Sequence, residues 1–130
     1  MYKGNWQQKG DQDYWINLIN GYVVRDYYDH VDETDGWVIL DDKGMMISCE
    51  YSPTKEDCMD EVDHSFMNEG FEFSPTGGNY TVRILKTWDG YEHGVSDRPV
   101  RMAQVHRVND RTGELIKSEK PFDTIIEFKY

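Results

Sequence analysis

The sequence predicts an α+β protein: mostly antiparallel β-sheet of about eight strands, with one amphipathic helix near 53–69. Most segments alternate apolar and polar side chains, which is the period of a strand, and turn residues separate them. A single segment combines helix-capping residues with a helical apolar stripe. At 130 residues, the chain is most simply one α+β domain, 1–130, with a single core.

The clearest hairpin signal is YWINLINGYVVRDYY, with strands expected at 14–19 and 22–28. Asn20-Gly21 supplies the two positive-φ positions of a type I′ turn, whose twist matches that of paired strands. A helix over 13–20 that ends at Gly21 is the alternative. The two-residue turn would set the register, pairing Leu18 with Val23, Ile19 with Tyr22 and Ile16 with Arg25.

A second hairpin is expected over 36–51, around the turn sequence DDKG. Its second strand alternates, and one set of its side chains is expected to face the core: Met45, Ile47, Cys49 and Tyr51. Ahead of the first hairpin, GNWQQ is expected to add a strand through a turn near 10–11.

The helix is predicted from its two ends and its apolar stripe. Ser52 is the expected N-cap, with Pro53 as the first helical residue, where its missing N–H costs nothing. Gly70 is the expected C-terminal cap. The buried stripe is formed by Met59, Val62 and Phe66, with Cys58 at its margin.

The second half of the chain predicts further strands at 79–88, 100–108, near 115–119 and at 124–130. The polar stretch 89–98 reads as a loop. We expect the helix to pack on one face of the antiparallel sheet.

Charge is distributed unevenly along the chain, whose formal net charge is −11. Residues 26–72 hold 15 acidic and 2 basic residues, whereas 1–25 and 73–130 each carry a net charge of +1. Solubility alone does not require this concentration, so the acidic segment indicates a partner surface, with a solvated face as the alternative. The basic side chains that alternate along the later strands are fewer: Arg83, Lys86, Arg101 and Arg107. Direct nucleic-acid binding is therefore not expected.

No membrane span or signal peptide is expected, because no apolar run approaches about 20 residues and the N-terminus MYKGNWQQKG is polar. A cytoplasmic protein is the default expectation. The two cysteines, Cys49 and Cys58, fit this expectation and lack the C-x-x-C spacing of a zinc site.

The acidic stretch DETDG was tested as a calcium loop. If Gly36 were the sixth position, Val31 would be the first, and it has no side-chain oxygen. Asp42 would be the twelfth, where a bidentate Glu is usual. The stretch is better explained as a solvated turn between two strands, so we expect neither a metal nor another cofactor.

Enzymatic activity is not expected. The loop WDGYEHGVSDRP places His93 near several carboxylates, which could support acid–base chemistry. No nucleophile, zinc-protease or phosphate-binding motif accompanies it. A small hydrolase built on the 89–98 loop therefore stays an alternative.

The leading expectation is a non-enzymatic binding protein whose acidic face docks on a basic protein surface. On the helix, Glu56 and Asp60 are four residues apart, as are Asp57 and Glu61, so like charges repel. A partner would relieve that repulsion. The candidate binding residues are Asp29, Asp32, Glu33, Asp35, Glu56, Asp57, Asp60, Glu61 and Asp63, with Tyr27, Tyr28 and Trp37 as apolar anchors.

Extended basic surfaces commonly bind nucleic acid, so a nucleic-acid-processing enzyme is the expected kind of partner. A small acidic chain of this type has the character of a viral accessory inhibitor that mimics nucleic acid. This is an analogy of size and charge. The other alternative is a β domain that binds a small ligand or a carbohydrate through exposed Trp and Tyr side chains.

Overall fold

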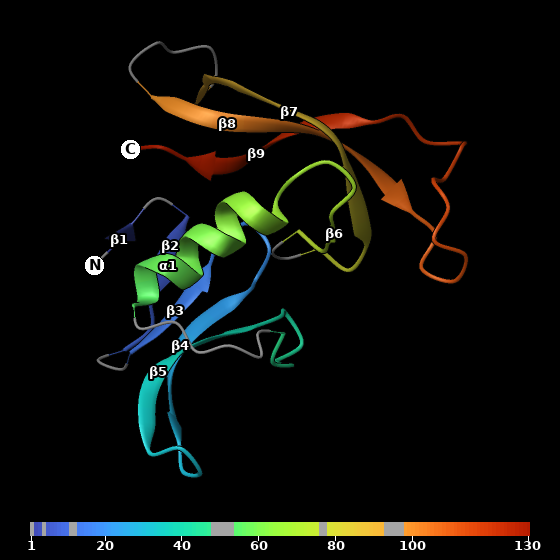
Figure 1. Ribbon diagram of the computed structural model, residues 1–130. Helices are drawn as coiled ribbons and strands as arrows, with labels where there is room; N and C mark the ends of the chain where they lie inside the picture. Colours follow the sequence, from blue (N-terminus) through green and yellow to red (C-terminus); the bar gives the residue numbers. More distant parts are fainter. Residues whose placement is uncertain (1, 4, 11–12, 48–53, 76–77, 93–97) are drawn as a thin grey trace.

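The computed structural model describes residues 2–3, 5–10, 13–47, 54–75, 78–92 and 98–130. These residues form two antiparallel sheets and one helix (Figure 1). The first sheet follows chain order: β1 (Tyr2–Lys3), β2 (Trp6–Gln8), β3 (Tyr14–Asn17), β4 (Val23–Asp29) and β5 (Thr34–Leu40). The second sheet contains β6 (Glu72–Phe73), β7 (Thr81–Tyr91), β8 (Pro99–Val108) and β9 (Phe122–Phe128), again in chain order.

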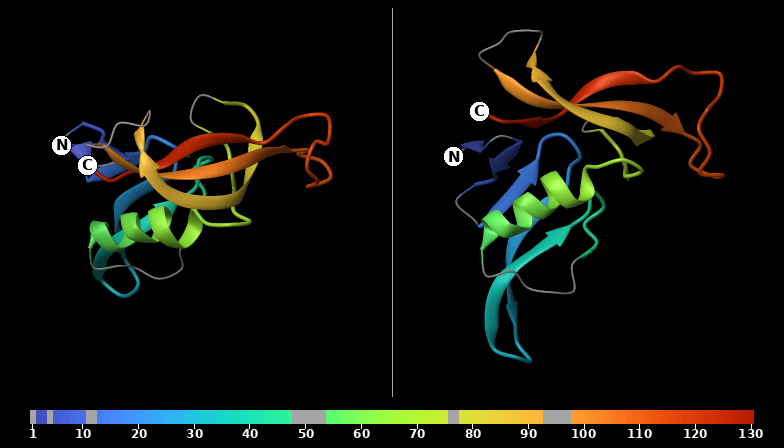
Figure 2. Two further views of the ribbon diagram at one scale, coloured as in Figure 1. Left: turned by 90° about the horizontal axis from the view of Figure 1, so that it is seen from above. Right: turned by 45° about the horizontal axis from the view of Figure 1, so that its top comes forward.

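The predicted class, α+β with mostly antiparallel sheet, is confirmed. The helix covers one face of the first sheet, as expected, and the second sheet lies across its far end (Figures 1 and 2). The first strands of the chain and the last strand lie close together in all the ribbon views, so the two ends of the chain meet. The first sheet uses short, tight connections, which is why its order follows the sequence.

The first hairpin forms, but its predicted register is wrong. Tyr14 pairs with Arg25 and Ile16 with Val23, so the connection spans 18–22 instead of two residues. The reason is that Asn17 acts as a cap: its Oδ1 accepts hydrogen bonds from the backbone N–H groups of residues 19 and 20. Gly21 has a positive φ of 77°, whereas Asn20 does not, so the turn is not type I′.

The helix begins two residues later than predicted. Thr54 is the N-cap, and its hydroxyl accepts from the Asp57 N–H at 3.2 Å; Ser52 and Pro53 lie outside the described residues. The α-helix α1 (Lys55–Asp60) continues as a π-helix, η1 (Glu61–Phe66). Gly70 has a positive φ but lies beyond the helix end and donates to the Ile84 carbonyl.

The predicted buried stripe is confirmed for Cys58, Met59 and Val62, which pack on Trp6, Trp15, Val24 and Ile39 of the first sheet. Phe66 is half-buried against the same cluster. A second buried cluster lies on the other sheet and includes Val82, Ile84, Val105 and Ile126. Met67 belongs to this second cluster, so the residue that ends the helix joins the two sheets.

The predicted second hairpin is only partly present. β4 and β5 pair with each other along seven residues. The DETDG stretch (32–36), predicted as the turn, supplies only the last two residues of that turn, because the turn spans 30–33 and β5 already begins at Thr34. Of the predicted second strand, the structure describes only 45–47, and within these residues a single bridge joins Leu40 to Met46. Met45 and Ile47, expected in the core, are 67% and 40% exposed because they lie at the sheet edge. Cys49 and Tyr51 lie outside the described residues.

The long strands β7, β8 and β9 confirm the predictions for 79–88, 100–108 and 124–130. The predicted strand near 115–119 is wrong: a single bridge joins Leu115 to Val108. The stretch read as a loop, 89–98, is partly strand, because β7 extends to Tyr91. Within the described chain, no helix combines the length and apolar character needed to cross a membrane.

The packing of the helix can be tested at one methionine. We expect Met59→Ala to lower the free energy of unfolding by about 2–5 kcal/mol, because Met59 is 1% exposed between the helix and the first sheet. The control is Met46→Ala at the exposed sheet edge, which should change stability by less than about 0.5 kcal/mol. Urea denaturation followed by circular dichroism measures both; equal effects would contradict this packing.

Candidate functional site

Most of the predicted acidic residues are exposed on the β4–β5 hairpin and the helix. We call this set the acidic surface; it comprises Asp26, Asp32, Glu33, Asp35, Glu56, Asp57, Asp60 and Glu61, all exposed. Asp26 was not among the predicted site residues. Asp29 is half-buried, and its carboxylate accepts from the N–H groups of Val31 and Asp32, so it shapes the hairpin tip.

The strand register places the hairpin carboxylates beside the helix. Val24 and Ile39 pair across the hairpin and contact the helix, so the next residues on that face are Asp26 and Trp37, which also pair. Lys55 is the first residue of the helix, and its Nζ lies over the Trp37 ring, 5.9 Å from the ring centroid. The acidic surface therefore runs from the helix onto the free part of the hairpin, which extends away from the body of the molecule (Figure 1).

The three predicted apolar anchors are not equivalent. Tyr28 is 43% exposed and shares the helix-side face with Trp37. Trp37 is half-buried against the core, which leaves less of its ring for a partner. Tyr27 is 39% exposed but lies on the opposite face, because side chains alternate along a strand. These three rings therefore cannot act as a single patch.

Among the described residues, the carboxylates of the acidic surface form fewer ion pairs than those on or beside the second sheet. No lysine or arginine in the described part of the chain forms an ion pair with Asp26, Asp32, Glu33, Asp35, Asp60 or Glu61. On the second sheet, by contrast, basic side chains pair locally: Arg83 with Glu72, Arg98 with Glu92, Arg107 with Glu119 and Lys129 with Asp89. Arg101 donates to the Met67 carbonyl. The basic strand residues are thus engaged within the fold.

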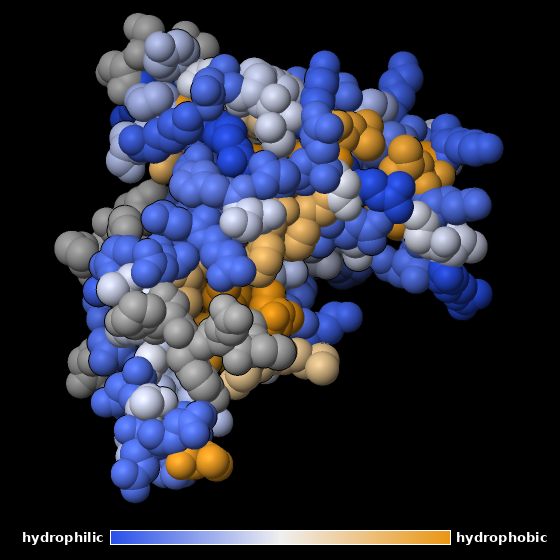
Figure 3. All heavy atoms as spheres, viewed as in Figure 1, coloured by the Kyte–Doolittle hydropathy of each residue, from blue (hydrophilic) through white to orange (hydrophobic). Residues whose placement is uncertain are grey.

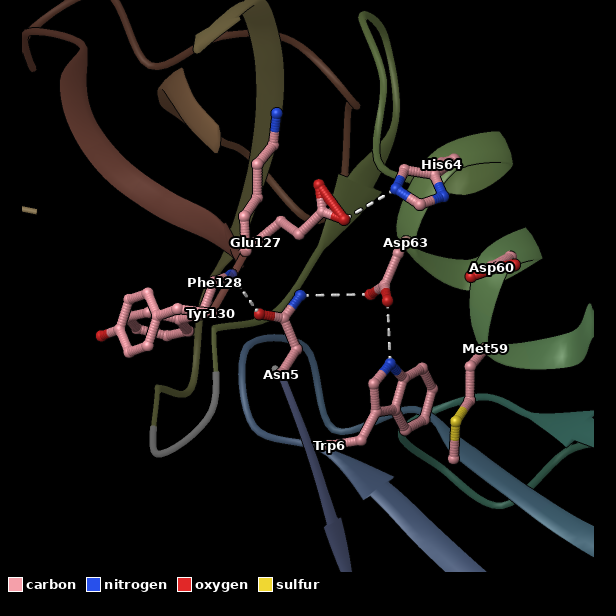
Figure 4. A pocket seen from close by; sticks show the side chains of 10 residues that line it. Asn5, Trp6, Met59, Asp60, Asp63, His64, Glu127, Phe128 and Tyr130 are labelled. Atoms are coloured by element: carbon pink, nitrogen blue, oxygen red, sulfur yellow. Dashed lines mark hydrogen bonds and ion pairs between the residues drawn. The ribbon is translucent and has the colours of Figure 1, made fainter. Parts of the chain in front are cut away.

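Asp63 does not belong to the acidic surface, and its prediction as an exposed binding residue is wrong. It is 8% exposed and points into the interface between the helix and the N-terminal strands (Figure 4). One carboxylate oxygen accepts from Asn5 at 3.1 Å and Asn17 at 3.2 Å, and the other accepts from the Trp6 indole at 2.9 Å. The wider π-helical turn lets Val62 and Asp63, two consecutive residues, both face inward.

Burial raises the pKa of the Asp63 carboxyl above its ordinary value of 3.8, and the charge of Glu127 acts in the same direction. The hydrogen bonds from Trp6 and Asn5 oppose this increase in pKa, because they stabilise the carboxylate. Since three protein donors already occupy its oxygens, Asp63 has a structural role in this geometry.

A cleft of about 400 Å³ lies beside this network, between the helix and the end of the chain (Figure 4). At its edge, His64 of the helix lies 2.6 Å from Glu127 of β9, measured from Nε2 to Oε2. The Asn5 side chain also connects to β9: it donates to the Ile126 carbonyl and accepts from the Phe128 N–H. These contacts join the helix and the N-terminal strands to β9. Nothing local in the sequence predicts them, because the residues lie far apart in the chain.

In the described part of the 89–98 stretch, two carboxylates contact side chains at the C-terminal end of the chain. Asp89 lies 2.6 Å from the Lys129 ammonium, which lowers the pKa of that carboxyl, and Glu92 accepts from the Tyr130 hydroxyl. His93 lies outside the described residues, so the hydrolase alternative stays a prediction. Among the residues that the structure describes, no three His, Cys, Asp or Glu side chains gather as metal ligands.

Comparison with known proteins finds no matching protein family, no matching curated protein and no matching solved structure.

The structural role of Asp63 predicts a large difference between neighbouring acidic residues. We expect Asp63→Ala to lower the free energy of unfolding by about 2–4 kcal/mol, because it leaves buried donors on Trp6 and Asn17 without acceptors. Asp60→Ala, one turn earlier on the exposed side, should change it by less than about 0.5 kcal/mol. Urea denaturation of both variants is the measurement, and comparable losses would refute the burial of Asp63.

The raised pKa of Asp63 predicts a pH dependence of defined sign. The folded state binds the proton more tightly than the unfolded chain does, so the stabilisation that comes from protonating Asp63 is complete below pH 3.8 and is lost as pH rises through the folded-state pKa. The hydrogen bonds to the carboxylate remain above that pH. Asp63→Asn does not titrate. The free energy of unfolding of the wild type minus that of Asp63→Asn should therefore decrease as pH rises above about 4. Denaturation at a series of pH values tests this; an increase would mean that the pKa is lowered.

Proposed function

We propose that this protein is a non-enzymatic binding protein whose acidic surface docks on a basic, nucleic-acid-binding surface of another protein. In this proposal it acts as a small inhibitor of the viral accessory type, presenting carboxylates where the partner would otherwise bind phosphates. The observation that carries the proposal is a contrast in charge pairing among the described residues. Four basic side chains on or beside the second sheet pair with carboxylates there, whereas six carboxylates of the acidic surface form no ion pair with a described Lys or Arg: Asp26, Asp32, Glu33, Asp35, Asp60 and Glu61.

Like charges that lie close together on the helix have an energetic cost in the isolated protein. Glu56 and Asp60 are exposed one helical turn apart, and so are Asp57 and Glu61. Each like-charge pair costs a few tenths of a kcal/mol. A basic partner removes this repulsion on binding and gains the attraction, so the arrangement favours association with a cationic surface.

The shape of the molecule supports the same proposal. The free end of the β4–β5 hairpin extends beyond the helix, so its carboxylates can enter a groove without the rest of the molecule following (Figures 1 and 2). Asp29 holds the turn through two backbone hydrogen bonds, which keeps the tip ordered before binding. A preorganised element binds at a lower entropic cost than a flexible one.

The proposal is tested with a site variant and a charge-matched control. The site variant carries three neutralising substitutions: Asp35→Asn, Asp60→Asn and Glu61→Gln. The control neutralises three exposed carboxylates near or on the second sheet, in the changes Asp110→Asn, Glu114→Gln and Asp123→Asn. Both change the net charge by the same amount. Each protein is immobilised and exposed to nuclease-treated cell lysate, and bound proteins are eluted with duplex DNA or with salt.

We expect the wild type and the control to retain nucleic-acid-binding proteins that duplex DNA displaces, and the site variant to retain at least tenfold less. Retention should weaken between low and physiological ionic strength, because screening of exposed charges then acts over about 8 Å. Equal loss from both variants would show that net charge alone is responsible. Retained proteins that DNA does not displace would exclude a nucleic-acid-binding surface as the target.

A further inference from the structure

A strip of apolar side chains lies open between the two sheets, beyond the C-terminal end of the helix. Tyr22, Phe66 and Phe71 form its floor; all three are half-buried, and their ring centroids lie 5.9–6.4 Å apart. Met45 and Ile47 lie at the edge of the first sheet, joined to Asp41 and Ile39 by backbone hydrogen bonds, and they share the sheet face of Tyr22. Figure 3 shows hydrophobic surface gathered in this hollow, while most of the helix and hairpin surface is hydrophilic.

The strand pairing explains why these side chains meet. Leu40 bridges to Met46, so Met45 and Ile47 lie on the same side as Ile39, which is the side covered by the helix. The helix does not cover this edge, and Met45 stays 67% exposed. Exposed apolar side chains that adjoin half-buried aromatic rings are typical of a docking surface.

Negative charge adjoins the strip. Val23 pairs with Leu40, so the next residues, Tyr22 and Asp41, lie opposite each other. The Asp42 Cβ lies 3.4 Å from where a Cβ on Gly21 would be. Burial raises the pKa of the Tyr22 hydroxyl, and the carboxylates of Asp42 and Asp41 raise it further. Glu69, also exposed, follows the helix toward Phe71. A ligand that covers the strip therefore meets apolar contacts in the middle and carboxylates at the border.

We propose that this strip, formed by Tyr22, Met45, Ile47, Phe66 and Phe71, binds an amphipathic, basic segment of the partner protein. The segment places apolar side chains on the aromatic floor and Lys or Arg side chains on the surrounding carboxylates. This inference rests on the proposed function, which supplies the basic partner, and adds a second, apolar contact to it. A second copy of this chain is a poorer occupant, because association would bring together two molecules that each carry a net charge of −11.

Three synthetic peptides of equal length serve as probes: an amphipathic Leu/Lys peptide, a Leu/Glu peptide of the same pattern, and a Lys/Ser peptide without apolar residues. Binding is measured by fluorescence polarisation at physiological ionic strength. The test variant is Met45→Ser with Ile47→Ser, at exposed positions. The control is Val31→Ser, which removes a 90% exposed apolar side chain at the hairpin tip, outside the strip. Thermal unfolding checks that all variants fold.

We expect the Leu/Lys peptide to bind the wild type and Val31→Ser equally, and the double serine variant about tenfold more weakly. The Lys/Ser peptide should bind the wild type more weakly than the Leu/Lys peptide does, and should not distinguish the variants. The Leu/Glu peptide should not bind.

Three results would overturn the inference in distinguishable ways. If the double serine variant binds the Leu/Lys peptide as tightly as the wild type, but neutralising Asp35, Asp60 and Glu61 weakens binding, the strip is not used and the proposed function stands. If the Leu/Glu peptide binds as well as the Leu/Lys peptide, charge does not select the partner and both proposals fail. A wild-type dimer that the serine changes dissociate would identify a second copy as the occupant.

Discussion

The buried carboxylate of Asp63 is the interaction on which the arrangement of this protein depends. It accepts hydrogen bonds from β2, β3 and the residue before β2, and it comes from the middle of the helix. Asn5, one of its donors, also holds the edge of β9 through two further hydrogen bonds. One acidic side chain and one amide thus tie together the helix and both sheets. Breaking a buried network of this kind leaves several polar groups without partners, which is costly in a low-dielectric interior.

The helix carries two kinds of acidic residue, one buried and hydrogen-bonded and the others exposed. Asp63 is satisfied by neutral donors inside the fold, whereas Asp60 and Glu61, immediately before it, face solvent. The helix therefore has a polar contact on its inner side and uncompensated charge on its outer side. Because the inner contact fixes the helix on the sheet, the outer carboxylates and the hairpin are held in a constant relation to each other. A partner would meet a rigid charged surface.

Several sequence predictions failed where a contact between distant residues decided the outcome. The hairpin register depends on Asn17, whose side chain caps the loop and also reaches Asp63 on the helix. Met45 and Ile47 alternate as a strand should, yet only a single bridge joins their segment to the sheet, so they stay exposed. The helical stripe was predicted correctly because its apolar spacing is local, but the π-helical turn that buries Asp63 beside Val62 has no local sequence signal.

The sequence by itself determined the α+β class, the position of the helix, the long strands and the concentration of acidic charge in one segment. These properties depend on alternation, capping and composition, which act between near neighbours in the chain. Only the tertiary structure decided which carboxylates are exposed, that His64 meets Glu127, and that Tyr22, Phe66 and Phe71 come together. The physical reason is that burial depends on contacts between residues 46 to 121 positions apart in the Asp63–Asn5 network. No pattern within one segment contains that information.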